Sequence, residues 1–66
     1  GHVYVADAGN QRILQFRKDG TFVRQFRPKR GSDAFRELRS VYVNEAAQKM
    51  LILTAEGLYI ANIPAE

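Results

Sequence analysis

Short apolar runs with the two-residue period of β-strands fill this sequence, and turn-forming residues separate them. Alternate side chains of a strand point to opposite faces, so β-branched and aromatic residues at every second position indicate half-buried strands. No stretch keeps the 3.6-residue period of a helix beyond a single turn. The sequence therefore predicts an all-β fold with strands at residues 2–6, 12–16, 21–26, 39–43, 49–53 and 58–63.

Turn signals divide these strands into two antiparallel units. Asp19-Gly20 is a strong hairpin signal, and residues 8–10 also favour a turn. Pro28 and Gly31 interrupt any strand between the two units. Two three-stranded sheets packed face to face are therefore expected. The predicted units are residues 1–26 and residues 39–63, joined by a loop at 27–38.

The loop and the third strand carry further expectations about packing. Residues 33–38 favour one helical turn capped by Ser32 or Asp33. Phe35 and Leu38 are expected to fill the gap between the sheets, and Phe22 and Phe26 are expected to share one strand face. In the strand at residues 49–53, every residue after Lys49 is apolar, so both faces of that strand should be covered. Largely buried side chains are expected at Val5, Leu14, Val41, Leu51, Ile52 and Ile60.

The chain has 66 residues and no cysteine, so disulfides cannot stabilise it. Below about 70–80 residues, one core rarely contributes more than about 3–5 kcal/mol of net stability. His2 is the only histidine, which is too few for a histidine metal site, and no cofactor is predicted. The isolated chain is therefore not expected to be a stable monomer.

The same apolar pattern occurs twice, at an offset of 47 residues (from Asp7 to Thr54). Residues 3–7 align with residues 50–54 without a gap. The same alignment places Ile13 on Ile60 and Phe16 on Ile63. Propeller blades repeat about every 40–50 residues, so the offset suits two consecutive blades.

The segment VYVADAGNQRI (residues 3–13) is more specific. It resembles the signature of the NHL repeat, an apolar strand ending in Val-Ala-Asp followed by x-Gly-Asn-x-Arg-Ile. Phe16, the Asp19-Gly20 turn and Phe22 also suit that family. The second unit resembles it only in apolar pattern, because Thr54, Glu56, Gly57 and Tyr59 replace its aspartate, glycine, asparagine and arginine.

This resemblance implies antiparallel β-propeller blades with four strands each, named a to d from the axis outward. Residues 1–26 would be strands b, c and d of one NHL blade. Residues 39–63 would be strands a, b and c of the next, degenerate blade, after the inter-blade loop at 27–38. The chain would then be the C-terminal one and a half blades of an incomplete propeller, and the missing blades are its expected partners.

Four residues of the signature predict a structural turn motif: Asp7, Gly9, Asn10 and Arg12. Gly9 and Asn10 tolerate the positive φ that a tight connection requires. Asp7 and Arg12 face each other across the turn, where a carboxylate accepts hydrogen bonds from a guanidinium. The motif is therefore interpreted as a turn support, with a ligand contact as the alternative.

Arg27, Lys29 and Arg30 form a possible binding surface on the loop rim, at the same end as the 7–12 turn. The sequence favours the interpretation that these charges only keep the rim soluble, and contact with an anionic partner is the alternative. The resemblance implies a rim that some NHL propellers use for RNA and others for proteins. Single-stranded RNA needs exposed aromatics for stacking, and Phe35 is the only aromatic of this loop. A protein or small ligand is therefore expected, and nucleic acid is not.

The sequence favours a binding scaffold over an enzyme. It contains no clustered serine, histidine and carboxylate and no glycine-rich phosphate loop between a strand and a helix. His2 begins a strand and is expected to be solvated. The alternative is the terminal part of a propeller enzyme or sensor, lyase-like or kinase-linked, with active groups in missing blades. No apolar run approaches the roughly 20 residues of a membrane span, so this segment should make no membrane contact.

Overall fold

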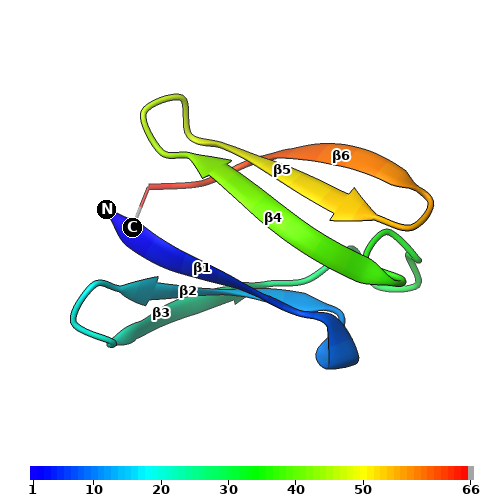
Figure 1. The fold of residues 1–66 in the computed structure, drawn as a ribbon, viewed down its shortest axis with the longest axis horizontal. Coiled ribbons are helices and arrows are strands. Elements are labelled where there is room, and N and C mark those ends of the chain that lie inside the picture. Colours follow the sequence, from blue (N-terminus) through cyan, green and yellow to red (C-terminus); the bar gives the residue numbers. More distant parts are fainter. Residues whose placement is uncertain (66) are drawn as a thin grey trace.

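Two three-stranded antiparallel sheets lie face to face in the computed structural model, which describes residues 1–65 (Figure 1). The strand order is β1-β2-β3 in the first sheet and β4-β5-β6 in the second. This confirms the predicted all-β fold. The elements are β1 (His2–Asp7), the 3-10 turn η1 (Ala8–Asn10), β2 (Arg12–Arg17), β3 (Phe22–Phe26), β4 (Leu38–Asn44), β5 (Lys49–Thr54) and β6 (Gly57–Asn62).

The β2–β3 hairpin turns at the Asp19-Gly20 pair, as predicted. Gly20 has φ +94°, a conformation that side chains disfavour and glycine adopts freely. Its N–H donates to the Arg17 carbonyl oxygen over 2.9 Å. The Thr21 N–H donates to Oδ1 of Asp19 over 2.8 Å, so the aspartate side chain stabilises the turn that contains it.

The link between the sheets contains a hydrogen-bonded turn where one helical turn was expected. The Arg36 N–H donates to the Asp33 carbonyl oxygen over 2.9 Å, and Ser32 Oγ accepts from the Ala34 N–H over 3.1 Å. Glu37 then takes the left-handed φ of 53°, which ends any helical path and leads the chain into β4. Phe35 and Leu38 are buried between the sheets, as predicted.

The core lies between the inner faces of the two sheets. Its buried members are Ile13, Phe35, Leu38, Met50, Ile52 and Ile63. Tyr4, Ala6, Phe26 and Val41 are among the half-buried residues that pack around them. The core therefore draws on both sheets, on the link and on the segment after β6.

The predicted set of core residues is largely wrong. Of the six positions, only Ile52 is buried, while Leu14 and Val41 are half-buried. Val5, Leu51 and Ile60 are 42%, 38% and 68% exposed. The expectation that both faces of β5 are covered is also wrong, because Leu51 and Leu53 are exposed while Met50 and Ile52 are buried. Apolar residues occur on both faces of each sheet, so alternation alone could not identify the inner face.

A β-bulge separates Phe22 from Phe26, which were expected to share a face. Phe26 pairs with Ile13 on the inner face, but the register shifts after Gln15, and Phe22 pairs with Phe16. The two phenylalanine rings meet edge to face, with centroids 5.7 Å apart, on the outer face of the first sheet. A bulge adds one residue to a strand and so reverses the facing of the positions beyond it.

Each sheet also carries an apolar outer face. Paired residues of neighbouring strands lie on the same face, so the pairing gives its members. The trailing face, on the first sheet, consists of Val3, Val5, Leu14, Phe16 and Phe22. The leading face, on the second sheet, consists of Tyr42, Leu51, Leu53, Leu58 and Ile60.

Positions 47 residues apart point in the same direction through the two sheets. Ile13 points from the first sheet toward the second, and Ile60 points from the second sheet onward in that direction. Val3 points away from the second sheet, and its equivalent Met50 points back toward the first. The two sheets are therefore stacked head to tail, as consecutive units of a repeat are.

No helix in residues 1–65 is long and apolar enough to cross a membrane.

Candidate functional site

The turn between β1 and β2 is held by the Asp7 carboxylate. Arg12 Nε donates to Asp7 Oδ2 over 2.8 Å, and Asn10 Nδ2 donates to the same oxygen over 3.1 Å. The Arg12 and Asn10 hydrogen bonds hold the pKa of Asp7 below its ordinary value of 3.8. Arg12 also donates from a terminal nitrogen to Gln25 Oε1 over 3.0 Å, which links the turn to β3.

The backbone of this turn differs from the prediction for Gly9 and Asn10. Neither has a positive φ, because both belong to the 3-10 turn η1. Gln11 takes the left-handed conformation instead, with φ 51° and ψ 53°, and its N–H donates to the Ala8 carbonyl oxygen over 3.2 Å. Residues within a 3-10 turn have a negative, right-handed φ. The left-handed conformation that reverses the chain is therefore adopted by the residue that follows the turn.

Thr54 supports the equivalent turn of the second sheet. Its Oγ1 accepts from the Glu56 N–H over 3.2 Å and donates to the Gly57 carbonyl oxygen over 3.3 Å. Thr54 is 5% exposed, so its hydroxyl has little contact with water. A side-chain oxygen therefore stabilises the turn in both units, although the aspartate is missing from the second.

The first turn and the link loop together form a cleft of about 330 Å³ at one end of the molecule. Residues 9–11 and 27–32 line it. Gly9 and Asn10 of the predicted turn motif therefore meet the three predicted basic residues there, whereas Asp7 and Arg12 are not part of the lining. A terminal nitrogen of Arg27 donates to the Asn10 carbonyl oxygen over 3.4 Å and ties the loop to the turn. We call this surface the rim cleft.

The rim cleft is basic. Arg27, Lys29 and Arg30 are exposed in it, and no carboxylate of residues 1–65 pairs with any of them. Asp7 is engaged by Arg12 and Asn10, so it does not neutralise these cations directly. An incoming carboxylate or phosphate would meet three cations whose hydrogen-bonding capacity is largely free.

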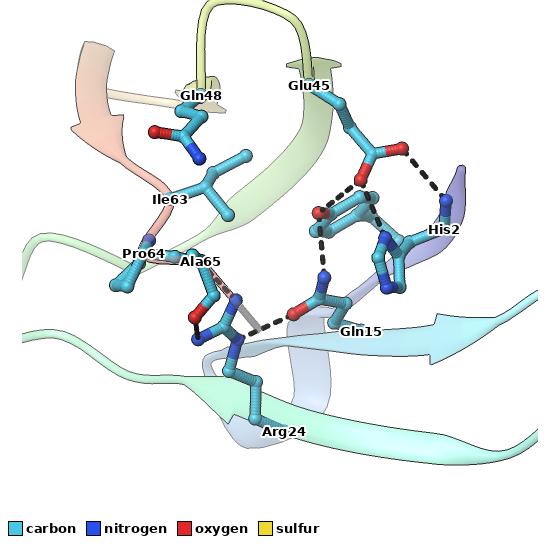
Figure 2. A pocket seen from close by; sticks show the side chains of 9 residues that line it. His2, Gln15, Arg24, Glu45, Gln48, Ile63, Pro64 and Ala65 are labelled. Atoms are coloured by element: carbon cyan, nitrogen blue, oxygen red, sulfur yellow. Dashed lines mark hydrogen bonds and ion pairs between the residues drawn. The ribbon is translucent and has the colours of Figure 1, made fainter.

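Glu45 joins the two sheets at the opposite end of the molecule (Figure 2). It lies on the β4–β5 turn and accepts from His2 Nδ1 over 2.7 Å and from the His2 backbone N–H over 2.9 Å. These two hydrogen bonds lower the pKa of Glu45 from its ordinary value of 4.5. The prediction of a solvated His2 is wrong, because its side chain is 20% exposed and packs against this carboxylate.

Hydrogen bonds continue from Glu45 across the first sheet (Figure 2). The Tyr4 hydroxyl lies 3.4 Å from Glu45 Oε2 and accepts from Gln15 Nε2 over 2.9 Å. Burial, and then the charge of Glu45, raise the pKa of Tyr4. Arg24 Nε donates to Gln15 Oε1 over 2.6 Å. The Arg24 guanidinium also donates to the carbonyl oxygens of Pro64 and Ala65.

This network surrounds a cleft of about 210 Å³ between the sheets. Gln15 is 1% exposed, and both ends of its amide are hydrogen-bonded. Because its polar groups already have partners within the chain, the network is suited to joining the sheets and the segment after β6. The sequence carried one signal for it, a glutamine between two large apolar residues of a strand, which the strand pattern did not single out.

Within residues 1–65, no three histidine, cysteine or acidic side chains lie together as metal ligands would. No family model matches the sequence. No curated protein and no solved structure matches it either.

Proposed function

We propose that this chain forms adjacent blades of an NHL-type β-propeller and serves as a binding scaffold, whose rim cleft recognises an acidic group on a protein or small ligand. The observation that carries the proposal is the position of Arg27, Lys29 and Arg30 around one cleft, without a carboxylate partner among the described residues. The head-to-tail stacking of the two sheets supports the propeller part of the proposal.

The support for the rim is both geometric and electrostatic. Residues 9–11 form one wall of the cleft, and the Asp7-Arg12 pair supports the turn to which they belong. The loop from Arg27 to Ser32 provides the cations. Binding to preformed groups loses little conformational entropy on the turn side. Charges at a rim also steer an anionic partner and make its association sensitive to salt.

The composition of the cleft favours a protein or small ligand over nucleic acid. None of the residues that line it is aromatic. The aromatic residue of the loop, Phe35, is 6% exposed and belongs to the core. Sequence-tolerant binding of single-stranded nucleic acid relies on bases stacked on exposed aromatic rings. The rim therefore offers charge without a stacking surface.

The test is binding of a fluorescent oligoglutamate peptide, followed by anisotropy at several salt concentrations. Saturable binding that weakens with salt is expected. Lys29→Glu should weaken it on the order of tenfold, since a charge-assisted contact becomes a repulsion. Lys18→Glu makes the same change of charge on the β2–β3 turn, away from the cleft, and should have little effect. Equal losses in the two variants would assign the binding to net charge and refute the rim as the site.

A further inference from the structure

We propose that a second copy of this chain docks head to tail on the first, with the leading face of one copy against the trailing face of the other. The leading face is the outer face of the second sheet, and the trailing face is the outer face of the first. The inference rests on the repeat and on burial, and it does not depend on what the rim binds.

Both faces are too apolar and too exposed to be ordinary solvent-facing sheet surfaces. On the leading face, Ile60 is 68% exposed, Tyr42 61% and Leu58 59%. On the trailing face, Phe22 is 54% exposed and Val3 49%. Soluble monomers rarely expose contiguous apolar patches that span neighbouring strands, and such patches mark interaction sites. Each sheet therefore has one covered face and one face that lacks a partner within residues 1–65.

The packing inside the chain indicates which surface covers each outer face. Ile60 stands in the repeat position of Ile13, yet Ile13 is 0% exposed because the second sheet covers it. Val3 and Val5 stand in the positions of Met50 and Ile52, which are 1% and 2% exposed against the first sheet. The leading face is thus the repeat equivalent of the first sheet's inner face, which the second sheet covers. The trailing face is the repeat equivalent of the second sheet's inner face, which covers the first sheet.

The shape of the leading face agrees with this arrangement. It contains a hollow of about 510 Å³, lined by Tyr42, Lys49, Leu51 and Ile60 among others. In the existing interface, Ile63 lines a cleft beside Tyr4. The repeat equivalents of these two residues are Phe16 and Leu51. Phe16 of a second copy is therefore expected to enter the hollow beside Leu51.

Such a contact is heterologous, because it joins two different surfaces, and it leaves one face of each kind free at the ends of a dimer. Further copies add in the same orientation. The rotation between neighbouring units decides whether they close into a ring or form an open array. Two leading faces that paired with each other would instead form a closed symmetric dimer. The two modes therefore predict different behaviour for variants that block one face.

The experiment uses two variants, each placing a charge at an exposed position of one face. Ile60→Glu blocks the leading face, and Val3→Glu blocks the trailing face. Sedimentation velocity of the unaltered chain should show assemblies of two or more copies. Each variant alone should be monomeric, since every contact needs one face of each kind. An equimolar mixture of the two should form a dimer with one copy of each and nothing larger.

Ala55→Glu, on the exposed β5–β6 turn and outside both faces, is the control and should assemble like the unaltered chain. Circular dichroism checks that each variant keeps its strands. If Ile60→Glu loses them, Leu58→Glu replaces it on the same face. A mixture that remains monomeric would overturn the proposal. So would a single-face variant that still forms dimers by itself, or an unaltered chain that is a monomer at all concentrations.

Discussion

Arg12 Nε lies 2.8 Å from Asp7 Oδ2, and this contact joins the last residue of β1 to the first residue of β2. The two residues are also directly paired across the strands. The ion pair thus lies at the point where the chain reverses, and Asn10 adds a second hydrogen bond to the same oxygen. The arrangement makes the pair a support for the rim cleft.

Arg12→Ala should therefore lower the melting temperature by a few degrees, a modest change because the pair is partly exposed. Binding at the rim should persist in the folded variant. Arg39→Ala removes an exposed arginine of β4 and should leave the melting temperature unchanged. Thermal melts followed by circular dichroism compare the two. Lost binding with an unchanged melting temperature would make Arg12 a ligand contact instead.

Two glycines should respond differently to alanine. Gly9 lacks a positive φ, and a methyl group there would meet no atom within 4 Å, so Gly9→Ala should change stability by less than about 0.5 kcal/mol. Gly20→Ala places a side chain at φ +94° and should cost about 1 kcal/mol or more. Denaturant unfolding at one protein concentration measures both. A larger loss of stability for Gly9→Ala would indicate that Gly9 has the positive φ expected from the sequence.

Gln15 should be the most sensitive polar position of the first sheet. Gln15→Ala removes the groups that bind the Tyr4 hydroxyl and Arg24 Nε, and leaves both partly buried without this partner. A loss of about 1–3 kcal/mol is expected for such unsatisfied groups. Gln25→Ala, which removes one exposed hydrogen bond with Arg12, should cost less. Denaturant unfolding decides the order, and equal losses would contradict the role given to the network.

Acid should weaken the junction at Glu45. Its pKa is lower in the folded chain than the ordinary value of 4.5, so the stabilisation is present above that value and is lost as the pH falls through the folded pKa. Glu45→Gln should reduce the loss of melting temperature between neutral pH and pH of about 3. Glu56→Gln, on an exposed turn, serves as the control. Identical acid sensitivity in all three proteins would rule out this contribution.

The sequence predicted the arrangement of strands well, because local signals determine it. Asp19-Gly20 forms its hairpin and Phe35 fills the core through properties that each segment carries by itself. The choice of inner face was wrong for Val5 and Ile60, since both faces of each sheet are apolar. A period of two identifies a strand, but it does not say which face meets another sheet.

The less predictable features depend on contacts between distant parts of the chain. His2 and Glu45 are 43 residues apart in sequence, and only the packing of the two sheets brings them together. The bulge that moves Phe22 to the trailing face also left no mark in the apolar pattern. The sequence did predict that the 7–12 turn and the basic loop lie at the same end of the molecule. This prediction was possible because alternate connections of an antiparallel meander lie at the same end of the sheet.

Each sheet is expected to need a covering surface on both of its faces, and the concentration dependence of folding examines this requirement. Circular dichroism melts of the 66-residue chain over a wide concentration range, with sedimentation equilibrium, give both the fold and the mass. The melting temperature should rise with concentration as copies associate, because association stabilises only the folded state. A monodisperse monomer that melts cooperatively at one temperature across the whole range would contradict it.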